Sequence, residues 1–523
     1  MRRTFTALLA VAAVSCALFT GAADAVASSP DPAPPSGQWT AAAPVPGLAQ
    51  LNVGKVAELG DIACASRGNC AAGGSFTAAN GVVQAWIASE VNGTWHAAEE
   101  VPGTAAMNWG GYAAVEYVSC PAPGECVAIG QVAGELGGDM TTFVATEAAG
   151  GGWAAANSLG PADAMFVAAI SCPQAGECVL GGQTGAYPSI RTERGANWSA
   201  PLVLPGITAL SRRDDATLDA LTCPTPGNCV AGGSYYSRVG NALGEPYQEA
   251  FVASEVNGRW GPAVEVPAIA RLNAGGLAQI LTISCVSVGD CAAGGSYQDG
   301  AGDTVTFVAN EVGGRWGVAL PVPGTGSAGD AGGSWLTGLT CTAAATCVAA
   351  GQVGQDGFIA QEVAGTWGKT RLVPDLTGHG TSVDDVSCRS AGNCVATGSA
   401  QLGTAASDVG AESFAMTERA GAWSRPTLLS VGGGGMTESD ALACGPDGEC
   451  SVGGWIQYGA DDQTASYSAY VAGYTPPPWV DRTTAVNAGA DRARALQRLR
   501  QRLRPGGRGT GDHGPFEIKN LNS

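Results

Sequence analysis

The stretch from Leu281 to Pro323 reads LTISCVSVGDCAAGGSYQDGAGDTVTFVANEVGGRWGVALPVP, and the same pattern recurs along nearly the whole chain. It contains two cysteines separated by five residues, then two apolar runs, the first with a Gly-Gly pair, and finally a glycine turn, a tryptophan and Val-Pro. Short apolar runs between glycine turns are typical of strands and hairpins. We therefore expect four short antiparallel strands in each unit, with the Gly-Gly pair marking close backbone packing.

Eight such units can be counted from the cysteines and the recurrent tryptophans. The first cysteines of successive units lie 47 to 62 residues apart, and the last unit has no Gly-x-Trp strand after Ala472. An isolated strand of this type stands instead at Trp39, near the other terminus. A linear solenoid would carry caps at both ends, and immunoglobulin-type domains would need about 100 residues each. The pattern therefore predicts an all-β fold, an eight-bladed β-propeller of four-stranded blades closed by an N-terminal strand.

The chain has 17 cysteines, and 16 remain if Cys16 is removed with a signal peptide. They form eight pairs with the same spacing: Cys64 and Cys70, Cys120 and Cys126, Cys172 and Cys178, Cys223 and Cys229, Cys285 and Cys291, Cys341 and Cys347, Cys388 and Cys394, Cys444 and Cys450. Structural zinc sites, the alternative, favour two to four residues between paired cysteines and usually include histidines, of which the chain has three. We expect eight local disulfides in an oxidising compartment.

The remaining segments differ in composition from the repeats. Residues 1–27 predict a secretory signal peptide, with a lipoprotein anchored through Cys16 as the alternative, and residues 28–36 form a Pro-rich linker. The propeller is expected over residues 37–475. Residues 476–523 form a basic tail whose arginines and leucines predict an amphipathic helix before Pro505. We therefore expect a secreted, extracellular protein with no transmembrane span.

Charge separates the propeller from the tail. Residues 28–475 carry 15 Lys and Arg against 40 Asp and Glu, whereas residues 476–523 carry 9 against 4. An acidic propeller disfavours nucleic-acid binding. The tail is a candidate for contact with an anionic surface or with the propeller itself, and the alternative is a solvated helix of no special role.

The repeat phrases S-C-x5-C-V-A-x-G and A-x-E-x-x-G-x-W resemble those of secreted bacterial β-propeller repeat proteins over residues 37–475. The resemblance implies architecture, not chemistry. Two better-known propeller types are distantly similar. The segment from Ser89 to Trp95 is one residue shorter than the sialidase Asp box and lacks its aspartate, and the quinoprotein motif has a longer Gly-to-Trp spacing. No catalytic residues are carried over from either.

The least repetitive segments are the loops expected around one mouth of the central channel. Their aromatic and charged residues are candidate ligand-binding residues, because sugar faces stack on rings and carboxylates accept hydrogen bonds from hydroxyls: Trp109, Tyr112, Arg212, Asp215, Tyr235, Tyr236, Trp335 and His379. Packing at the blade edge is the alternative for each. The innermost strands predict a second set, an acidic ring in the channel: Asp61, Glu116, Asp219, Asp384 and Asp440. Converging carboxylates would hold a cation, and calcium is a possible ligand, although no cofactor is expected.

No nucleophile elbow, zinc-protease motif or P-loop is present, and only His96 and His379 stand within the repeats. We therefore favour a monomeric, non-enzymatic binding or interaction module for a glycan or protein ligand. The first alternative is a secreted glycan-acting hydrolase or lyase that uses a carboxylate pair. The second is a carrier whose C-terminal peptide is processed or recognised.

Overall fold

The computed structural model describes residues 37–134, 140–148, 150–160, 165–211, 215–240, 244–326, 333–374, 376, 380–402, 410–429, 436–459 and 465–476. All of them belong to one compact unit that begins at Gly37. The predicted signal peptide, the Pro-rich linker and the helical tail lie outside the described residues. The domain boundaries drawn from the sequence therefore stay predictions.

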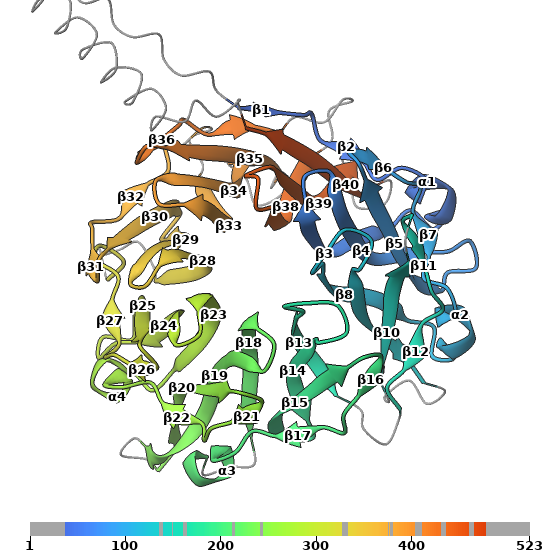
Figure 1. Ribbon diagram of the computed structural model, residues 1–523. Helices are drawn as coiled ribbons and strands as arrows, with labels where there is room; N and C mark the ends of the chain where they lie inside the picture. Colours follow the sequence, from blue (N-terminus) through green and yellow to red (C-terminus); the bar gives the residue numbers. More distant parts are fainter. Residues whose placement is uncertain are drawn as a thin grey trace, which may run out of the picture. The chain divides into compact units, whose positions relative to one another are not determined.

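The described strands form eight antiparallel sheets, so the predicted eight-bladed β-propeller is confirmed (Figure 1). In each blade the short outer strand is broken into two pieces that pair with the third strand. The first four blades contain these strands: β3 (Ala57–Ser66), β4 (Asn69–Thr77), β5 (Val83–Val91), β6 (Thr94–Trp95) and β7 (Glu99–Glu100); β8 (Ala113–Ser119), β9 (Val127–Ala133), β10 (Met140–Ala148), β11 (Gly152–Trp153) and β12 (Asn157–Ser158); β13 (Phe166–Ser171), β14 (Val179–Thr184), β15 (Tyr187–Arg194), β16 (Asn197–Trp198) and β17 (Leu202–Val203); β18 (Ala216–Thr225), β19 (Asn228–Gly240), β20 (Pro246–Val256), β21 (Arg259–Trp260) and β22 (Val264–Glu265).

The last four blades follow the same order. They contain β23 (Ala278–Ser287), β24 (Asp290–Gln298), β25 (Thr304–Val312), β26 (Arg315–Trp316) and β27 (Leu320–Pro321); β28 (Ser334–Ala343), β29 (Thr346–Val353), β30 (Asp356–Val363), β31 (Thr366–Trp367) and β32 (Arg371–Leu372); β33 (Thr381–Ser390), β34 (Asn393–Leu402), β35 (Gly410–Arg419), β36 (Ala422–Trp423) and β37 (Thr427–Leu428); β38 (Met436–Cys444), β39 (Cys450–Tyr458) and β40 (Ser466–Thr475), completed by β1 (Gln38–Trp39) and β2 (Ala43–Pro44).

The ring closes in the eighth blade as the sequence predicts. Gln38 pairs with Thr475 and Trp39 with Tyr474, and the two aromatic rings lie 5.1 Å apart between centroids. The innermost strands contact one another in the order β3, β8, β13, β18, β23, β28, β33, β38 and back to β3. Closure by an N-terminal strand therefore leaves the last sheet without an unpaired outer edge at these positions.

The hydrophobic core lies between the blades rather than within them. Eight clusters of buried side chains are found among the described residues, and each cluster joins two neighbouring blades. Large side chains of the third strands fill them, and Phe251, Phe307, Phe358 and Phe414 are fully buried. Each blade is too thin to bury its own faces, so stability comes from stacking against both neighbours.

A β-bulge in the innermost strand and a glycine in the second strand recur in all eight blades. In the fifth blade the pairing shifts between Ile280 and Thr282, which leaves Leu281 as the extra residue. Beside it, a Cβ on Gly295 would overlap the carbonyl oxygen of Gln279. The same overlap would occur at Gly74, Gly130, Gly182, Gly233, Gly351, Gly398 and Gly454. Close backbone contact at the bulge therefore explains the second glycine of each Gly-Gly pair, whereas a Cβ on the first, such as Gly294, would meet a side chain of the next blade, here Leu336.

All eight predicted disulfides are present, each between cysteines six positions apart. They close the hairpins between first and second strands, at the same end of the blades as the turns between third and fourth strands. At these turns Asn92 and Asn257 adopt φ of 51° and 52°, as expected for two-residue hairpins. We call this end of the propeller the disulfide face and the opposite end the loop face.

Four one-turn helices, which the sequence analysis did not predict, lie on the loop face between blades in the described part of the chain. They are α1 (Leu48–Leu51), α2 (Thr104–Met107), α3 (Ile207–Leu210) and α4 (Ile269–Leu272). Each follows a residue with positive φ, and each buries its first side chain. These helices are anchored to the blades, and they set the path of the loops that carry Trp109 and its neighbours.

Candidate functional site: the channel mouth

The innermost strands place one side chain per blade at the mouth of the channel on the loop face. These residues stand six positions before the first cysteine of each unit, and together we call them the mouth ring: Glu58, Ala114, Phe166, Thr217, Gln279, Trp335, Ser382 and Glu438. Alternate residues on the same strands are buried between blades, as Ala57 and Leu59 are beside the exposed Glu58. Since the outer side of each innermost strand is covered by its own blade, the exposed residues face the central axis.

The bulge residues form a second ring, deeper in the channel. Their positions lie four residues before the first cysteine, and we call them the bulge ring: Gly60, Glu116, Ala168, Asp219, Leu281, Thr337, Asp384 and Asp440. A bulge re-aims one side chain of a strand, so both rings can face the channel. Four members of the predicted acidic ring fall at these positions.

The two rings divide the channel into two halves of different chemistry. The seventh, eighth, first and second blades contribute only acidic or small side chains, and five of them are carboxylates: Asp384, Glu438, Asp440, Glu58 and Glu116. We call these five the acidic arc. The third to sixth blades contribute Phe166, Leu281 and Trp335 together with Ala168 and the polar residues Thr217, Asp219, Gln279 and Thr337. Both aromatic rings are exposed, by 62% and 51%. We call Phe166, Leu281 and Trp335 the apolar arc.

The carboxylates of the acidic arc influence one another. Burial raises the pKa of Asp440 to about 7, with further upward contributions from Glu438, Asp384 and Glu58. Burial also raises the pKa of Glu116 to about 7, and its Oε2 atom has no hydrogen-bond partner within the described part of the chain. The acidic arc is therefore a region of negative potential in which some of the carboxylates are protonated near neutral pH.

Asp384 and Asp219 are held by hydroxyl groups. Asp384 accepts hydrogen bonds from Ser382 (2.7 Å), Ser399 (2.9 Å) and, across the blade boundary, Ser439 (2.7 Å). Asp219, in the fourth blade, accepts one from Thr217 at 2.9 Å. Burial raises the pKa of both carboxyls, and these hydroxyls oppose the rise. Asp219 stands on the side of the apolar arc, apart from the other carboxylates.

Asp61 is placed differently from the other predicted ring members. Its Oδ1 accepts from the N–H of Ile62 and its Oδ2 from the N–H of Val118 in the next blade, both at 2.8 Å. Asp385 makes the same type of bridge between the seventh and eighth blades, to Val386 at 2.6 Å and to Leu442. Burial raises the pKa of each to about 7. These two aspartates join neighbouring innermost strands rather than lining the channel.

The predicted ligand-binding residues are spread around the loop face. Trp109 follows α2 and is 70% exposed, and Tyr112 is 41% exposed beside the acidic arc, where burial, Glu116 and Glu58 raise its pKa. Trp335 belongs to the sixth blade, four blades away from Trp109, so the structure does not bring these aromatics together.

The other predicted residues are less available. Tyr235 is 3% exposed and donates a 2.7 Å hydrogen bond to Glu265, so a ligand cannot reach it without displacing that contact. Tyr236 is half-buried, and Asp215 is exposed at the start of β18. Arg212 and His379 lie outside the described residues.

Several mouth-ring residues escaped the sequence analysis. Phe166, Glu58 and Glu438 stand at the same spacing from a cysteine as Trp335, six positions before it. That spacing was the available signal. It is a weak signal because the residues at this position differ in chemistry from blade to blade, whereas four of the residues two positions later are carboxylates.

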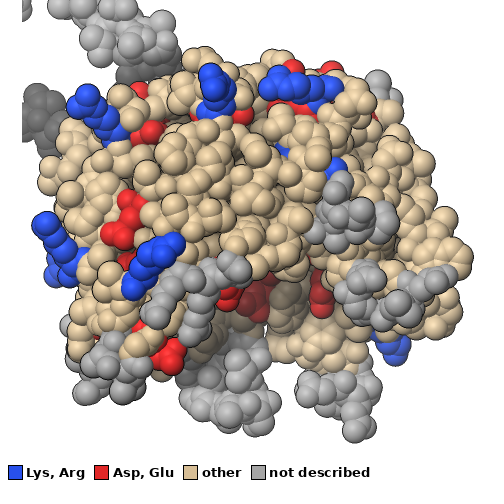
Figure 2. Space-filling model, turned by 90° about the horizontal axis from the view of Figure 1, so that it is seen from below, with Lys and Arg blue, Asp and Glu red and all other residues tan. Residues whose placement is uncertain are grey.

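Neither a metal site nor a membrane span is found in the described ranges. No group of three or more His, Cys, Asp or Glu side chains there is arranged to hold a metal ion. The same ranges contain no helix long and apolar enough to cross a bilayer. In an edge-on view, Lys and Arg side chains lie along one rim with Asp and Glu side chains beside them (Figure 2). That rim carries charge of both signs, unlike the acidic arc.

No protein-family model and no curated protein sequence matches the chain. Solved structures with similar folds include the BP39L lectin from Burkholderia pseudomallei, at 12% identity over 72% of this chain and 99% of the lectin, with a TM-score of 0.42. An ulvan lyase of family PL25 shares 11% identity over 81% of this chain and 94% of its own, with a TM-score of 0.39. The Trypanosoma rangeli sialidase shares 12% identity over 76% and 56%, with a TM-score of 0.32.

Proposed function

We propose that the protein is an exported, monomeric, non-enzymatic binding module that holds a glycan or protein ligand at the channel mouth. The observation that supports this proposal is the division of the mouth into an apolar arc with two exposed aromatic rings and an acidic arc. The eight disulfides agree with an oxidising, extracellular setting.

The two arcs suit ligands with one apolar and one hydrogen-bonding side. The face of a sugar ring packs on Phe166 or Trp335, while its hydroxyl groups donate to the carboxylates of the acidic arc. A protein loop with an apolar and a basic side chain would use the same two halves. Binding needs no catalytic group, and aromatic platforms supply contact area at small conformational cost.

A glycan array and a hydrolysis screen on the same purified protein test the proposal. We expect retention of a ligand without product. Trp335→Ala and Glu58→Gln should each weaken that retention at least tenfold, because they remove one platform and one acceptor. Glu99→Gln, an exposed carboxylate on the outer strand β7, is the control and should bind normally. Retention unchanged in both mouth variants would contradict the proposal.

A glycan-acting hydrolase or lyase is the second candidate. The favouring observation is that Glu116 and Asp440 have pKa values of about 7, as a general acid at neutral pH requires. In that case the same screen yields product, and Glu116→Gln or Asp440→Asn abolishes turnover while ligand retention persists. The carrier role of the tail stays a prediction from the sequence.

A further inference from the structure

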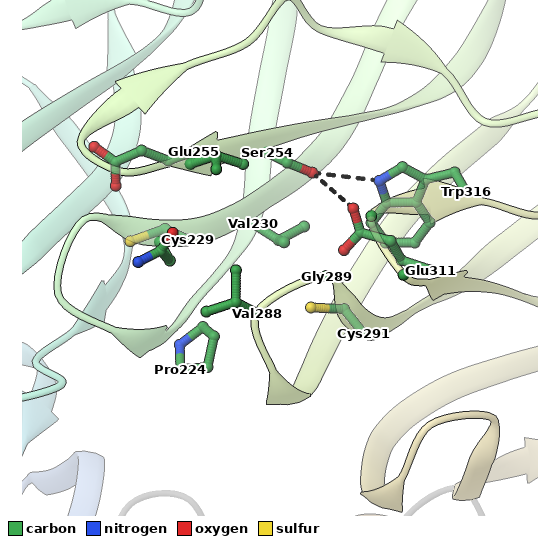
Figure 3. A pocket seen from close by; sticks show the side chains of 14 residues that line it. Pro224, Cys229, Val230, Ser254, Glu255, Val288, Gly289, Cys291, Glu311 and Trp316 are labelled. Atoms are coloured by element: carbon green, nitrogen blue, oxygen red, sulfur yellow. Dashed lines mark hydrogen bonds between the residues drawn. The ribbon is translucent and has the colours of Figure 1, made fainter.

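A cavity of about 300 Å³ opens at the boundary between the fourth and fifth blades, on the disulfide face. It lies at the end of the propeller opposite the channel mouth. Its walls are mostly apolar and come from both blades: Pro224, Val230, Val256, Val288 and Trp316. Figure 3 shows Glu311 and Trp316 together at one end of the cavity and Glu255 at the other. The volume is at the lower end of the range for ligand sites, enough for one long side chain.

Glu311 and Glu255 both line this cavity, and each keeps one carboxyl oxygen without a hydrogen-bond partner among the described residues; Glu311 is the one that lies beside Trp316. Its side chain belongs to β25 and is only 3% exposed. Oε1 accepts a 3.3 Å hydrogen bond from Ser254, which also accepts one from the Trp316 indole at 3.4 Å. Oε2 has no hydrogen-bond partner among the described residues. A buried carboxyl oxygen without a donor is costly, so a donor brought by a ligand would be favourable here.

The next two boundaries show how the chain fills this space elsewhere, although Oε2 of Glu362 and Oε2 of Glu418 also lack a hydrogen-bond partner among the described residues. Asn310 donates to Glu362 at 2.5 Å between the fifth and sixth blades, and Gln361 donates to Glu418 between the sixth and seventh. Ser254 occupies the equivalent position in the fourth blade. Because serine is shorter than either amide and carries no second donor, the cavity remains open beside Glu311.

At two other boundaries an arginine directly follows the glutamate that is equivalent to Glu311 in its blade. Arg194 of the third blade lies beside the fourth blade, where its charge lowers the pKa of Glu255 against the larger effect of burial. Arg419 of the seventh blade donates to the Tyr474 hydroxyl of the eighth at 2.9 Å. The equivalent residue at the cavity is Val256, which is 51% exposed. The chain thus reaches across two boundaries with a guanidinium group, and at this one it has none.

We propose that this cavity binds the guanidinium side chain of an arginine in a partner polypeptide. The planar guanidinium donates to the free oxygen of Glu311 and stacks against Trp316, and its methylene stem packs on Val230, Val256 and Val288. Negative charge around the cavity supports a cationic ligand. Asp290 lies near enough to raise the pKa of Glu311, in addition to the larger effect of burial.

Titration of the purified protein with N-acetyl-arginine amide, followed by NMR, tests the proposal. We expect saturable binding with a Kd of about 1 mM or tighter, with shifts at the Trp316 indole N–H. N-acetyl-citrulline amide has nearly the same shape without the charge and should bind at least tenfold more weakly. Absence of saturable arginine binding at millimolar concentration overturns the proposal, as does equal binding of the citrulline probe.

Two variants and a control locate the site. Glu311→Gln removes the charge and should weaken arginine binding at least tenfold, whereas Glu362→Gln, the same repeat position with its Asn310 donor present, should bind like the unmodified protein. Val256→Arg places a guanidinium from the chain itself into the cavity. It should abolish probe binding without lowering the melting temperature, because Arg194 and Arg419 occupy equivalent positions. Normal binding by Val256→Arg would place the probe elsewhere and overturn the proposal.

Discussion

Removal of the closing segment, residues 37–48, tests how far the ring depends on its N-terminal strand. The deletion takes away Val45 and Leu48, which are 2% and 0% exposed, and the contact between Trp39 and Tyr474. It also removes backbone hydrogen bonds from Thr40 to Gly473 and from Val45 to Ala469. Full burial of an aliphatic side chain contributes about 1.5–3 kcal/mol, an aromatic pair about 1 and each hydrogen bond about 1, so the expected loss is roughly 6 to 9 kcal/mol.

A loss of this size is comparable with the whole stability of many folded domains, about 5–15 kcal/mol. The deletion also exposes the edge of β40, so we expect a large fall in melting temperature together with aggregation on size-exclusion chromatography. A circular permutant that carries residues 37–48 after Pro476 is the matched control and should recover both properties. A truncated protein that stays monomeric and melts like the full chain would refute closure as the source of this stability.

Three further predictions concern pH, glycine and the disulfides. Asp61 and Asp385 have folded-state pKa values of about 7, above their ordinary value of 3.8, so their contribution to stability is greatest below about pH 4 and is lost as pH rises through 7. At about 1.4 kcal/mol per pKa unit, each carboxyl accounts for on the order of 4 kcal/mol of stability, so the melting temperature should fall from pH 5.5 to pH 8.5. The double variant Asp61→Asn with Asp385→Asn should flatten that fall. An equally steep fall in the variant would contradict this assignment. Gly295→Ala should destabilise the protein by about 3 kcal/mol or more in chemical denaturation, because its Cβ meets the carbonyl of Gln279. The control Gly300→Ala, whose Cβ meets only Ala274 at 3.6 Å, should be nearly neutral. Similar unfolding midpoints for the two variants would show that the bulge tolerates a Cβ. Non-reducing peptide mapping should recover Cys285 bridged to Cys291, and a long-range bridge in the map would contradict the hairpin assignment. Replacing both cysteines by Ser should lower the free energy of unfolding by about 2 kcal/mol in thermal unfolding, a small loss because the closed loop is short.

The architecture was predictable because the same cysteine and glycine positions recur in each unit. The cysteine spacing, the glycine turns and the unpaired strand at Trp39 together indicated the blade count and the closure, and the register of Trp39 opposite Tyr474 confirms them. The four one-turn helices were missed. Segments of four residues have no periodicity to detect, and their position depends on burying one side chain, such as Leu48, against blades that are distant in sequence.

The channel residues were predictable in part. Carboxylates four positions before a cysteine pointed to the innermost strands, but the bulge that leaves Asp440 exposed and brings Asp384 to Ser399 and Ser439 cannot be read from spacing alone. The bulge at Gly60 also turns the next residue, Asp61, toward the neighbouring blade, where it accepts a hydrogen bond from Val118. Tyr235 illustrates the opposite problem: an aromatic residue near a loop looks accessible until its partner Glu265 is known.

The identity of the closing strand has a consequence for how the chain folds during synthesis. The hydroxyl of Thr40 accepts from the N–H of Gly473, a contact between residues 433 positions apart. The segment made first must therefore wait, without its sheet, until nearly all of the repeats have emerged. Stacked blades can form progressively along the way, but the last one is complete only when both ends of the chain are available. A chain interrupted before β40 leaves its N-terminal strand without a partner, so the fold distinguishes finished molecules from unfinished ones by a single pairing event.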